Sequence, residues 1–239
     1  MTASVPGDVL RSAGGVTRIY LVRHGQTDWN AEERYQGRID STLSAYGRTQ
    51  AVLVAATLAA APLRAIYSSP LSRAHDTAAA IAARHGLPVR TLDDLREVGL
   101  GEWEGLTAAE ITARFGDVLR GRRRDPEGVV PGGGETLARL QARGLKAVTT
   151  IVARHPGETI VAVAHGGVNR AILLGVLGAP LSRYWAIRQD NAAINLLEFD
   201  ERGARVELLN ETAHLEAARS EIEEKSAAPA TCNCRPQPE

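Results

Sequence analysis

The segment TIVAVA, at residues 159–164, is the feature of this sequence that most constrains its fold. Apolar and β-branched residues fill it without the alternation of a half-exposed strand, so both faces of the predicted strand must be covered. A second strand-like run, TRIYLV, occupies residues 17–22. Strands that are buried on both faces are typical of a parallel sheet between two layers of helices.

The rest of the chain alternates between strand-like and helix-like patterns. Further short strands are predicted at 64–68 and 89–92, and edge strands or a hairpin at 192–199 and 205–210. Helices are predicted at 44–61, 71–85, 135–154 and 168–177, with a helical turn at 107–115 and a loop over 120–134. This order predicts an α/β fold, a three-layer αβα sandwich with a mostly parallel central sheet.

Length and composition predict one folded domain with extensions at both ends. The chain has 239 residues, which fits a single domain with additions. We expect a flexible leader at 1–16, a folded domain at 17–214 and a mostly disordered tail at 215–239, where the sequence turns to Ala, Glu, Ser and Pro. The leader lacks the basic start and apolar core of a signal peptide.

Charge and cysteine content exclude several classes of protein. Lys plus Arg and Asp plus Glu number 28 each, and this balance argues against a dedicated nucleic-acid or membrane-surface binder. No segment approaches the roughly 18–20 apolar residues of a membrane helix. Only Cys232 and Cys234 are present, so there is no disulfide framework and the default setting is cytoplasmic. Two thiols in a tail are weak evidence for a metal, and we predict none.

Residues suited to phosphate chemistry follow four of the predicted strands. They are Arg23, His24, Arg73, Glu97 and His165. The carboxyl ends of parallel strands form one edge of a sheet, where ligands bind. A cation in the first turn of a helix, as predicted for Arg73, interacts unfavourably with the helix dipole. Such an unfavourable placement is expected of a residue that binds phosphate.

These residue types suit phosphoryl transfer. Guanidinium groups match phosphoryl oxygens bidentately, and a neutral imidazole is a nucleophile near pH 7. A carboxyl group can protonate the leaving oxygen. The set therefore predicts a phosphate-sized site at the sheet edge.

Six segments together resemble the histidine phosphatase superfamily, in its phosphoglycerate-mutase-like branch. They are LVRHGQTDWN (21–30), YQGRIDSTLSAYGRTQA (35–51), IYSSPLSRAHDTA (66–78), LREVGLGEWEGLT (95–107), PGGGETL (131–137) and VAHGGVNRAIL (163–173). They occur in the family's order, and the resemblance covers about residues 17–211. It implies that the folded domain at 17–214 is a histidine phosphatase domain. No metal is expected in this family, and we predict no cofactor for this chain. Dimers are common in the family, so a homodimer stays open.

The resemblance implies a role for each matching residue. His24 would be the phosphorylated nucleophile, and Glu97 the general acid and then the base. Arg23, Arg73 and His165 would bind the transferring phosphoryl group, and these five form the predicted catalytic set. The predicted substrate-binding residues add Asn30, Gln36, Gly37 and Gly166. Gln26 stands where the family more often has Glu, and we expect this change to tune activity.

Three functions stay open from the sequence. A phosphomonoesterase acting on a small phosphorylated metabolite is favoured, because the short GLGEWEGLT turn after Glu97 resembles alpha-ribazole phosphatases and broad-specificity phosphatases. A cofactor-dependent phosphoglycerate mutase shares the first half-reaction, but mutases of this family carry a longer basic insertion there. A non-catalytic phosphate-binding module would have lost a core residue, and none is missing. The arginines at 120–124 form a solvated loop or help to recognise an anionic substrate.

Overall fold

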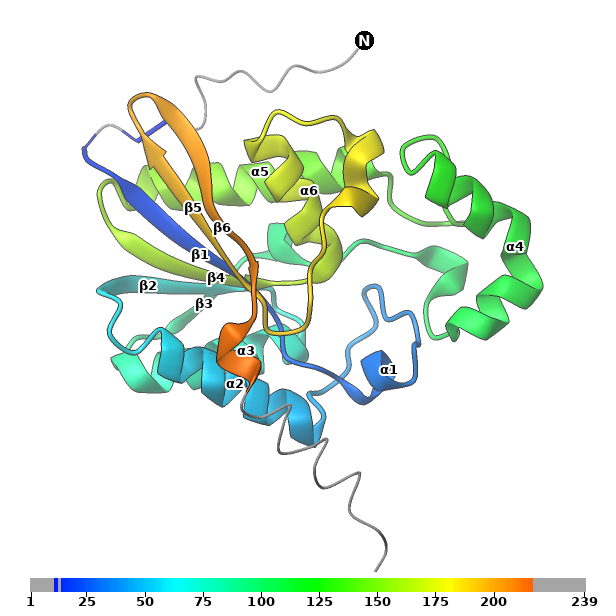
Figure 1. The fold of residues 1–239 in the computed structure, drawn as a ribbon, viewed down its shortest axis with the longest axis horizontal. Coiled ribbons are helices and arrows are strands. Elements are labelled where there is room, and N and C mark those ends of the chain that lie inside the picture. The colour runs from blue at the N-terminus through cyan, green and yellow to red at the C-terminus, as the bar shows by residue number, and fades with distance from the viewer. Residues whose placement is uncertain (1–10, 13, 217–239) are drawn as a thin grey trace, which may run out of the picture.

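The computed structural model describes residues 11–12 and 14–216, which form a six-stranded sheet with helices on both faces (Figure 1). The strand order is β3-β2-β4-β1-β5-β6. Neighbouring strands from β3 to β1 are parallel, and β5 is antiparallel to both β1 and β6. The strands are β1 (Thr17–Arg23), β2 (Leu63–Ser68), β3 (Val89–Thr91), β4 (Thr159–Ala164), β5 (Ile194–Asp200) and β6 (Gly203–Glu211). The mostly parallel sheet predicted from the sequence is confirmed.

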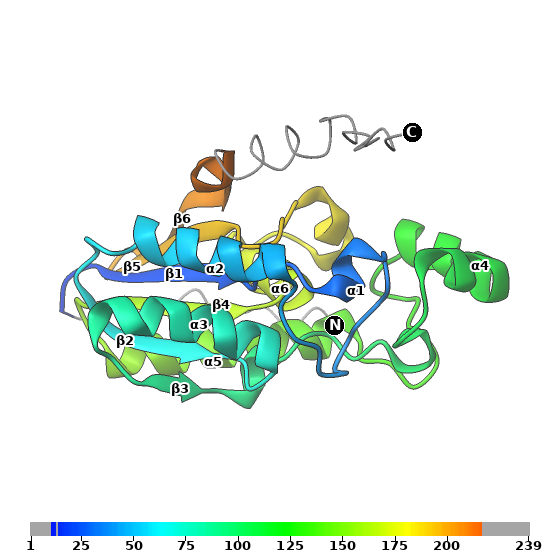
Figure 2. The same cartoon turned by 90° about the horizontal axis from the view of Figure 1, so that it is seen from below.

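Helices cover the sheet in two layers, which Figure 2 shows edge-on. The α-helices are α1 (Asp28–Ala31), α2 (Ala45–Thr57), α3 (Ser72–His85), α4 (Ala108–Arg124), α5 (Leu137–Arg154) and α6 (Gly166–Val176). Short 3₁₀ helices lie at Asp93–Leu95, Gly101–Trp103, Leu181–Ala186 and Ala213–Leu215. Apolar residues of α2 and α3 bury one face of the sheet, and those of α5 and α6 bury the other. The three-layer αβα sandwich is therefore confirmed.

The register of β1 and β4 fixes what meets at the carboxyl edge of the sheet. Every residue of β4 is buried, as its uninterrupted apolar sequence predicts. β4 lies between β1 and β2, and Arg23 at the end of β1 pairs with Ala164 at the end of β4. The next residues, His24 and His165, therefore leave the sheet side by side.

The predicted loop over 120–134 is wrong for its first third, because α4 runs on to Arg124. A capping box between Thr107 and Glu110 starts this helix. Arginine is a good helix former, and cations in the last turn complement the helix dipole. Arg122 is also buried, and its guanidinium donates to the Val129 carbonyl. Tertiary contacts thus order a segment whose charge and glycine content suggested a loop.

The other boundaries differ from the sequence predictions by a few residues. The helix predicted at 44–61 ends at Thr57, and α6 begins at Gly166, two residues before the predicted start. Within the predicted extensions, the Ser12 backbone donates to the Asp200 carbonyl and Leu215 is fully buried. Cys232 and Cys234 lie outside the described residues. None of the helices in 11–12 and 14–216 is long and apolar enough for a membrane span.

Candidate active site

A cavity of about 550 Å³ opens at the carboxyl edge of the sheet. It is bordered by the residues after β1, the first turn of α6, α4 and the 3₁₀ segment Leu181–Ala186. Arg23, His24, Arg73 and Glu97 all line it. Four of the five predicted catalytic residues, from three separate segments, therefore share one cavity.

The His24 side chain is held by a hydrogen bond at one of its two ring nitrogens. Its Nδ1 lies 2.6 Å from the Gly25 carbonyl oxygen. A carbonyl only accepts, so Nδ1 carries the proton and Nε2 keeps its lone pair. Burial, followed by the positive charges of Arg73 and Arg23, lowers the pKa of His24 well below its ordinary value of 6.5. The side chain is thus a neutral imidazole with a nucleophilic Nε2.

Arg23 and Arg73 are cations that the fold satisfies only in part. Arg23 donates to the Gln189 carbonyl, and Arg73 donates to the carbonyls of Gly37 and Ile39. The Nε of each arginine is buried without a hydrogen-bond partner. Burial lowers the pKa of Arg23 to about 10, so it remains charged at neutral pH. Buried donors of this kind need an acceptor, and a phosphoryl oxygen supplies one.

His165 lies behind His24 and is fully buried. The two ring centroids are 5.1 Å apart, with the planes inclined by 62°. Its Nε2 is 2.8 Å from the Ser69 hydroxyl, while Nδ1 is buried without a partner. Burial, with a smaller effect of the Arg73 charge, lowers the pKa of His165 well below its ordinary value. His165 is absent from the cavity lining but touches the nucleophile's ring.

Glu97 is fixed at the start of α6. Its carboxylate accepts the backbone N–H groups of Val98, Gly167 and Val168 at 2.8–3.1 Å. The last two are among the N–H groups that a helix leaves unpaired at its N-terminus, so they fix the position of the Glu97 carboxyl group. A Cβ on Gly167 would lie 2.3 Å from Glu97 Oε1, so only glycine lets the carboxylate reach this place.

The predicted substrate-binding residues also lie at the cavity. Asn30, Gln36, Gly37 and Gly166 all line it. Asn30 Oδ1 accepts from Thr27 and Asn191, so this amide orders the turn after β1. Gly25 and Gln26, which follow the nucleophile in the sequence, do not line the cavity. The Gln26 side chain contacts Ser44, and a Cβ on Gly25 would lie 2.4 Å from the Gly47 carbonyl oxygen.

Sequence reasoning missed several residues of this cavity. Arg34, Arg170, Tyr184 and Trp185 line it. Arg170 lies within the segment VAHGGVNRAIL, and the other three lie outside the six matching segments. Arg170 could have been found from its place on α6, one turn after Gly166. Its guanidinium lies over the rings of Tyr184 and Trp185, 5.7 and 5.6 Å from their centroids.

Comparison with known proteins decides the family. The model of the histidine phosphatase superfamily (branch 1) matches residues 19–212. The chain belongs to that superfamily. Phosphoserine phosphatase 1 of Hydrogenobacter thermophilus is 36% identical over 200 residues, which cover 84% of this chain and 95% of that protein. The metal-independent phosphoserine phosphatase of Arabidopsis thaliana is 37% identical over 206 residues, 84% of each chain.

A solved structure agrees with these relatives. Mycobacterial glucosyl-3-phosphoglycerate phosphatase Rv2419c, in complex with VO3, superposes with a TM-score of 0.75. The two sequences are 37% identical, and the match covers 82% of this chain and 99% of the chain in the solved structure. The chain is accordingly a phosphomonoesterase and a metal-independent histidine phosphatase, as the sequence predicts. This finding favours the phosphatase over the mutase and over the binding module.

The lowered pKa of His24 gives the first prediction. A lowered pKa keeps the imidazole neutral as the pH falls through 6.5, because protonation would bury a third positive charge beside Arg23 and Arg73. NMR of the ring nitrogens between pH 8 and pH 5 should show no protonation midpoint near 6.5 for His24. Arg73→Gln removes one of the charges and should move the midpoint upward. A wild-type midpoint at 6.5 would contradict this electrostatic picture.

Proposed function

We propose that this phosphatase works through a phosphohistidine on His24. In the first step His24 Nε2 bonds to phosphorus, and the bond from phosphorus to the leaving oxygen breaks. Arg23 and Arg73 offer charged donors to the phosphoryl oxygens, and His165 offers Nδ1–H. The observation that carries the proposal is the fixed His24 tautomer next to three buried nitrogens, Arg23 Nε, Arg73 Nε and His165 Nδ1, that lack partners.

Glu97 is the proposed proton donor and acceptor. Its carboxyl group protonates the departing oxygen in the first step and is left as a carboxylate. In the second step the carboxylate takes a proton from water, whose oxygen attacks phosphorus and breaks the bond to His24. Inorganic phosphate leaves, and His24 and the Glu97 carboxyl group return to their starting states. Phosphoryl transfer needs such positioning and charge stabilisation more than further covalent chemistry.

The cavity favours a phosphomonoester that carries a second anionic group. Six arginines and two glutamates line it, which leaves an excess of four positive charges. A phosphate monoester brings a charge of about −2. Among the described residues no acidic side chain forms an ion pair with Arg122, Arg123 or Arg170, whereas Arg34 pairs with Glu32.

A carboxylate is the second anion that best fits the relatives. Phosphoserine and glucosyl-3-phosphoglycerate, named for the related phosphatases, both carry one. We therefore favour a small carboxylated phosphate ester over alpha-ribazole phosphate as the substrate. We also propose that the reaction takes place in the cytoplasm. The helical position of Arg123 at the cavity supports substrate recognition by the arginines at 120–124.

Loss of the nucleophile tests the mechanism. His24→Ala should abolish hydrolysis of p-nitrophenyl phosphate while circular dichroism and thermal unfolding show a folded protein, because no other group in the site replaces a phosphohistidine. EDTA should leave wild-type turnover unchanged. Full activity in His24→Ala would exclude His24 as the nucleophile, and inhibition by EDTA that a metal reverses would contradict the metal-independent mechanism.

Two matched substrates test whether the cavity recognises a carboxylate in addition to the phosphate. 3-Phosphoglycerate and glycerol 3-phosphate differ by a carboxylate, and the protein should release phosphate from 3-phosphoglycerate with the higher kcat/KM. Arg123→Gln should reduce this preference about tenfold, the effect of one charge-assisted hydrogen bond. Arg124→Gln is the matched control, since Arg124 is the exposed neighbour outside the cavity lining. Equal kcat/KM values for the two substrates would refute the carboxylate preference.

A further inference from the structure

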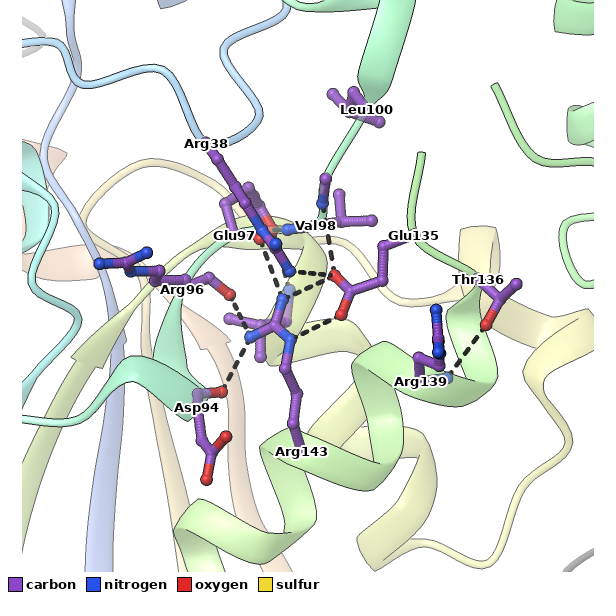
Figure 3. Close-up of polar contacts among 12 residues, drawn as sticks. Arg38, Asp94, Arg96, Glu97, Val98, Leu100, Glu135, Thr136, Arg139 and Arg143 are labelled. Atoms are coloured by element: carbon purple, nitrogen blue, oxygen red, sulfur yellow. Dashed lines mark hydrogen bonds and ion pairs between the residues drawn. The ribbon is translucent and has the colours of Figure 1, made fainter. Parts of the chain in front are cut away.

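An ion pair between Arg143 of α5 and Glu135 lies beneath the loop that carries Glu97 (Figure 3). Arg143 Nε donates to Glu135 Oε1 at 2.8 Å, and an Nη2 hydrogen donates to Oε2 at 2.9 Å. This is the two-pronged geometry in which a guanidinium and a carboxylate bind most strongly and with a fixed orientation. Both side chains are mostly buried, with 15% and 11% of their surfaces exposed.

The other donors of Arg143 bind the backbone of the Glu97 loop. Nη1 donates to the carbonyls of Asp94 and Arg96, at 2.9 and 2.6 Å, and Nη2 to the carbonyl of Glu97 at 2.9 Å. A guanidinium has five N–H groups. The three hydrogen bonds to carbonyls and the two to Glu135 use all five. A lysine in this place would supply neither the planar fork nor enough donors.

This loop has no strand or helix partner for those carbonyls. No backbone N–H group among the described residues donates to the carbonyls of Asp94, Arg96 or Glu97. All three residues are half-buried. Backbone carbonyls withdrawn from water require partners, and Arg143 is the partner that the fold provides. Removal of the Arg143 guanidinium would leave the carbonyls of these three residues, one of them Glu97 itself, without their hydrogen bonds.

Glu135 ties the same loop from its other side. Its backbone N–H donates to the Gly99 carbonyl at 2.8 Å, and its carboxylate accepts from the Gly99 N–H at 3.3 Å. Arg38, next to the Gly37 carbonyl that binds Arg73, reaches Glu135 at 3.2 Å. Burial raises the pKa of Glu135, but hydrogen bonds and charges from Arg143 and Arg38 outweigh this effect and bring it below its ordinary value. Glu135 is therefore an anion at neutral pH.

Neither residue reaches the substrate cavity. Arg143 and Glu135 are absent from the lining of the 550 Å³ cavity and border a separate hollow of about 560 Å³, with Arg38 and Lys146. Their hydrogen bonds connect them to the site through the loop that carries Glu97. We propose that Arg143 and Glu135 form a clamp that positions Glu97 for proton transfer to the leaving group. This inference rests on the proposed role of Glu97.

A leaving-group comparison tests the clamp. Alkyl phosphates need a proton on the departing oxygen, whereas p-nitrophenolate leaves without one. The ratio kcat/KM covers only the steps through departure of the leaving group, so it isolates the acid role of Glu97. Arg143→Gln should lower kcat/KM for 3-phosphoglycerate about 10- to 100-fold, the effect of a misplaced catalytic group. For p-nitrophenyl phosphate the fall should stay under about threefold.

Two further variants calibrate the test. Glu97→Gln should show the same selective loss, because it removes the acid itself. Lys146→Ala is the matched control: Lys146 also lies on α5 and pairs with Asp94 of the same loop, but its side chain is 73% exposed, and it should leave both kcat/KM values unchanged. Equal losses of Arg143→Gln on the two substrates would overturn the clamp. If Glu97→Gln itself showed no selectivity, the proposed role of Glu97 would fall first.

A second single variant, Glu135→Gln, keeps the proposal falsifiable if Arg143→Gln folds poorly. Glu135→Gln preserves shape and removes the charge that orients Arg143. It should reproduce the leaving-group selectivity, and Arg143→Gln/Glu135→Gln should be no worse than the more defective single variant, as expected for residues that act as one unit. Full additivity of the two losses, or wild-type selectivity in Glu135→Gln, would overturn the clamp.

Discussion

Two buried guanidinium groups at the carboxyl edge of the sheet determine most of what this protein can do. Arg73 is buried and Arg23 is half-buried, and most of their protein hydrogen-bond partners are backbone carbonyls. Burial of a charge is costly unless it is paired. The site is therefore built around positive charge that a bound anion completes, and a dianionic phosphate ester completes it best.

Burial, together with the same charges, sets the protonation state of the nucleophile. A histidine beside two cations in a dry site cannot easily take up a proton, so His24 stays neutral and its Nε2 remains free to attack. The parallel register of β1 and β4 brings His165 against it, and the N-terminus of α6 holds Glu97 on the cavity wall. Binding and activation of the phosphate thus follow from one arrangement of strand ends.

The sheet and the motif residues could be predicted from the sequence, because both depend on short local patterns. TIVAVA predicts a strand buried on both faces, and the structure gives β4 at those residues. His24, Arg73 and Glu97 follow from motifs of a few residues each. The path of α4 does not, because the burial of Arg122 depends on Val129 and on the cavity wall.

The clamp is hidden in the sequence for the same reason. Arg143 meets the carbonyl of Glu97, 46 residues away, by means of tertiary packing alone. On a helical wheel it is one more arginine on the partly exposed side of α5. Its role becomes visible only when the carbonyls that it binds are counted, because those carbonyls have no other partner in the backbone of the described residues.

Direct detection of phosphohistidine tests the central claim. Glu97→Gln, mixed with p-nitrophenyl phosphate and quenched in alkaline denaturant, should accumulate an enzyme-bound phosphoryl group, since p-nitrophenolate leaves readily while water activation is slowed. Mass spectrometry of the peptides should place that group on His24, in a linkage that survives alkali and is lost in acid. A burst of p-nitrophenol without a phosphorylated peptide, or with the phosphoryl group on another residue, would contradict the account.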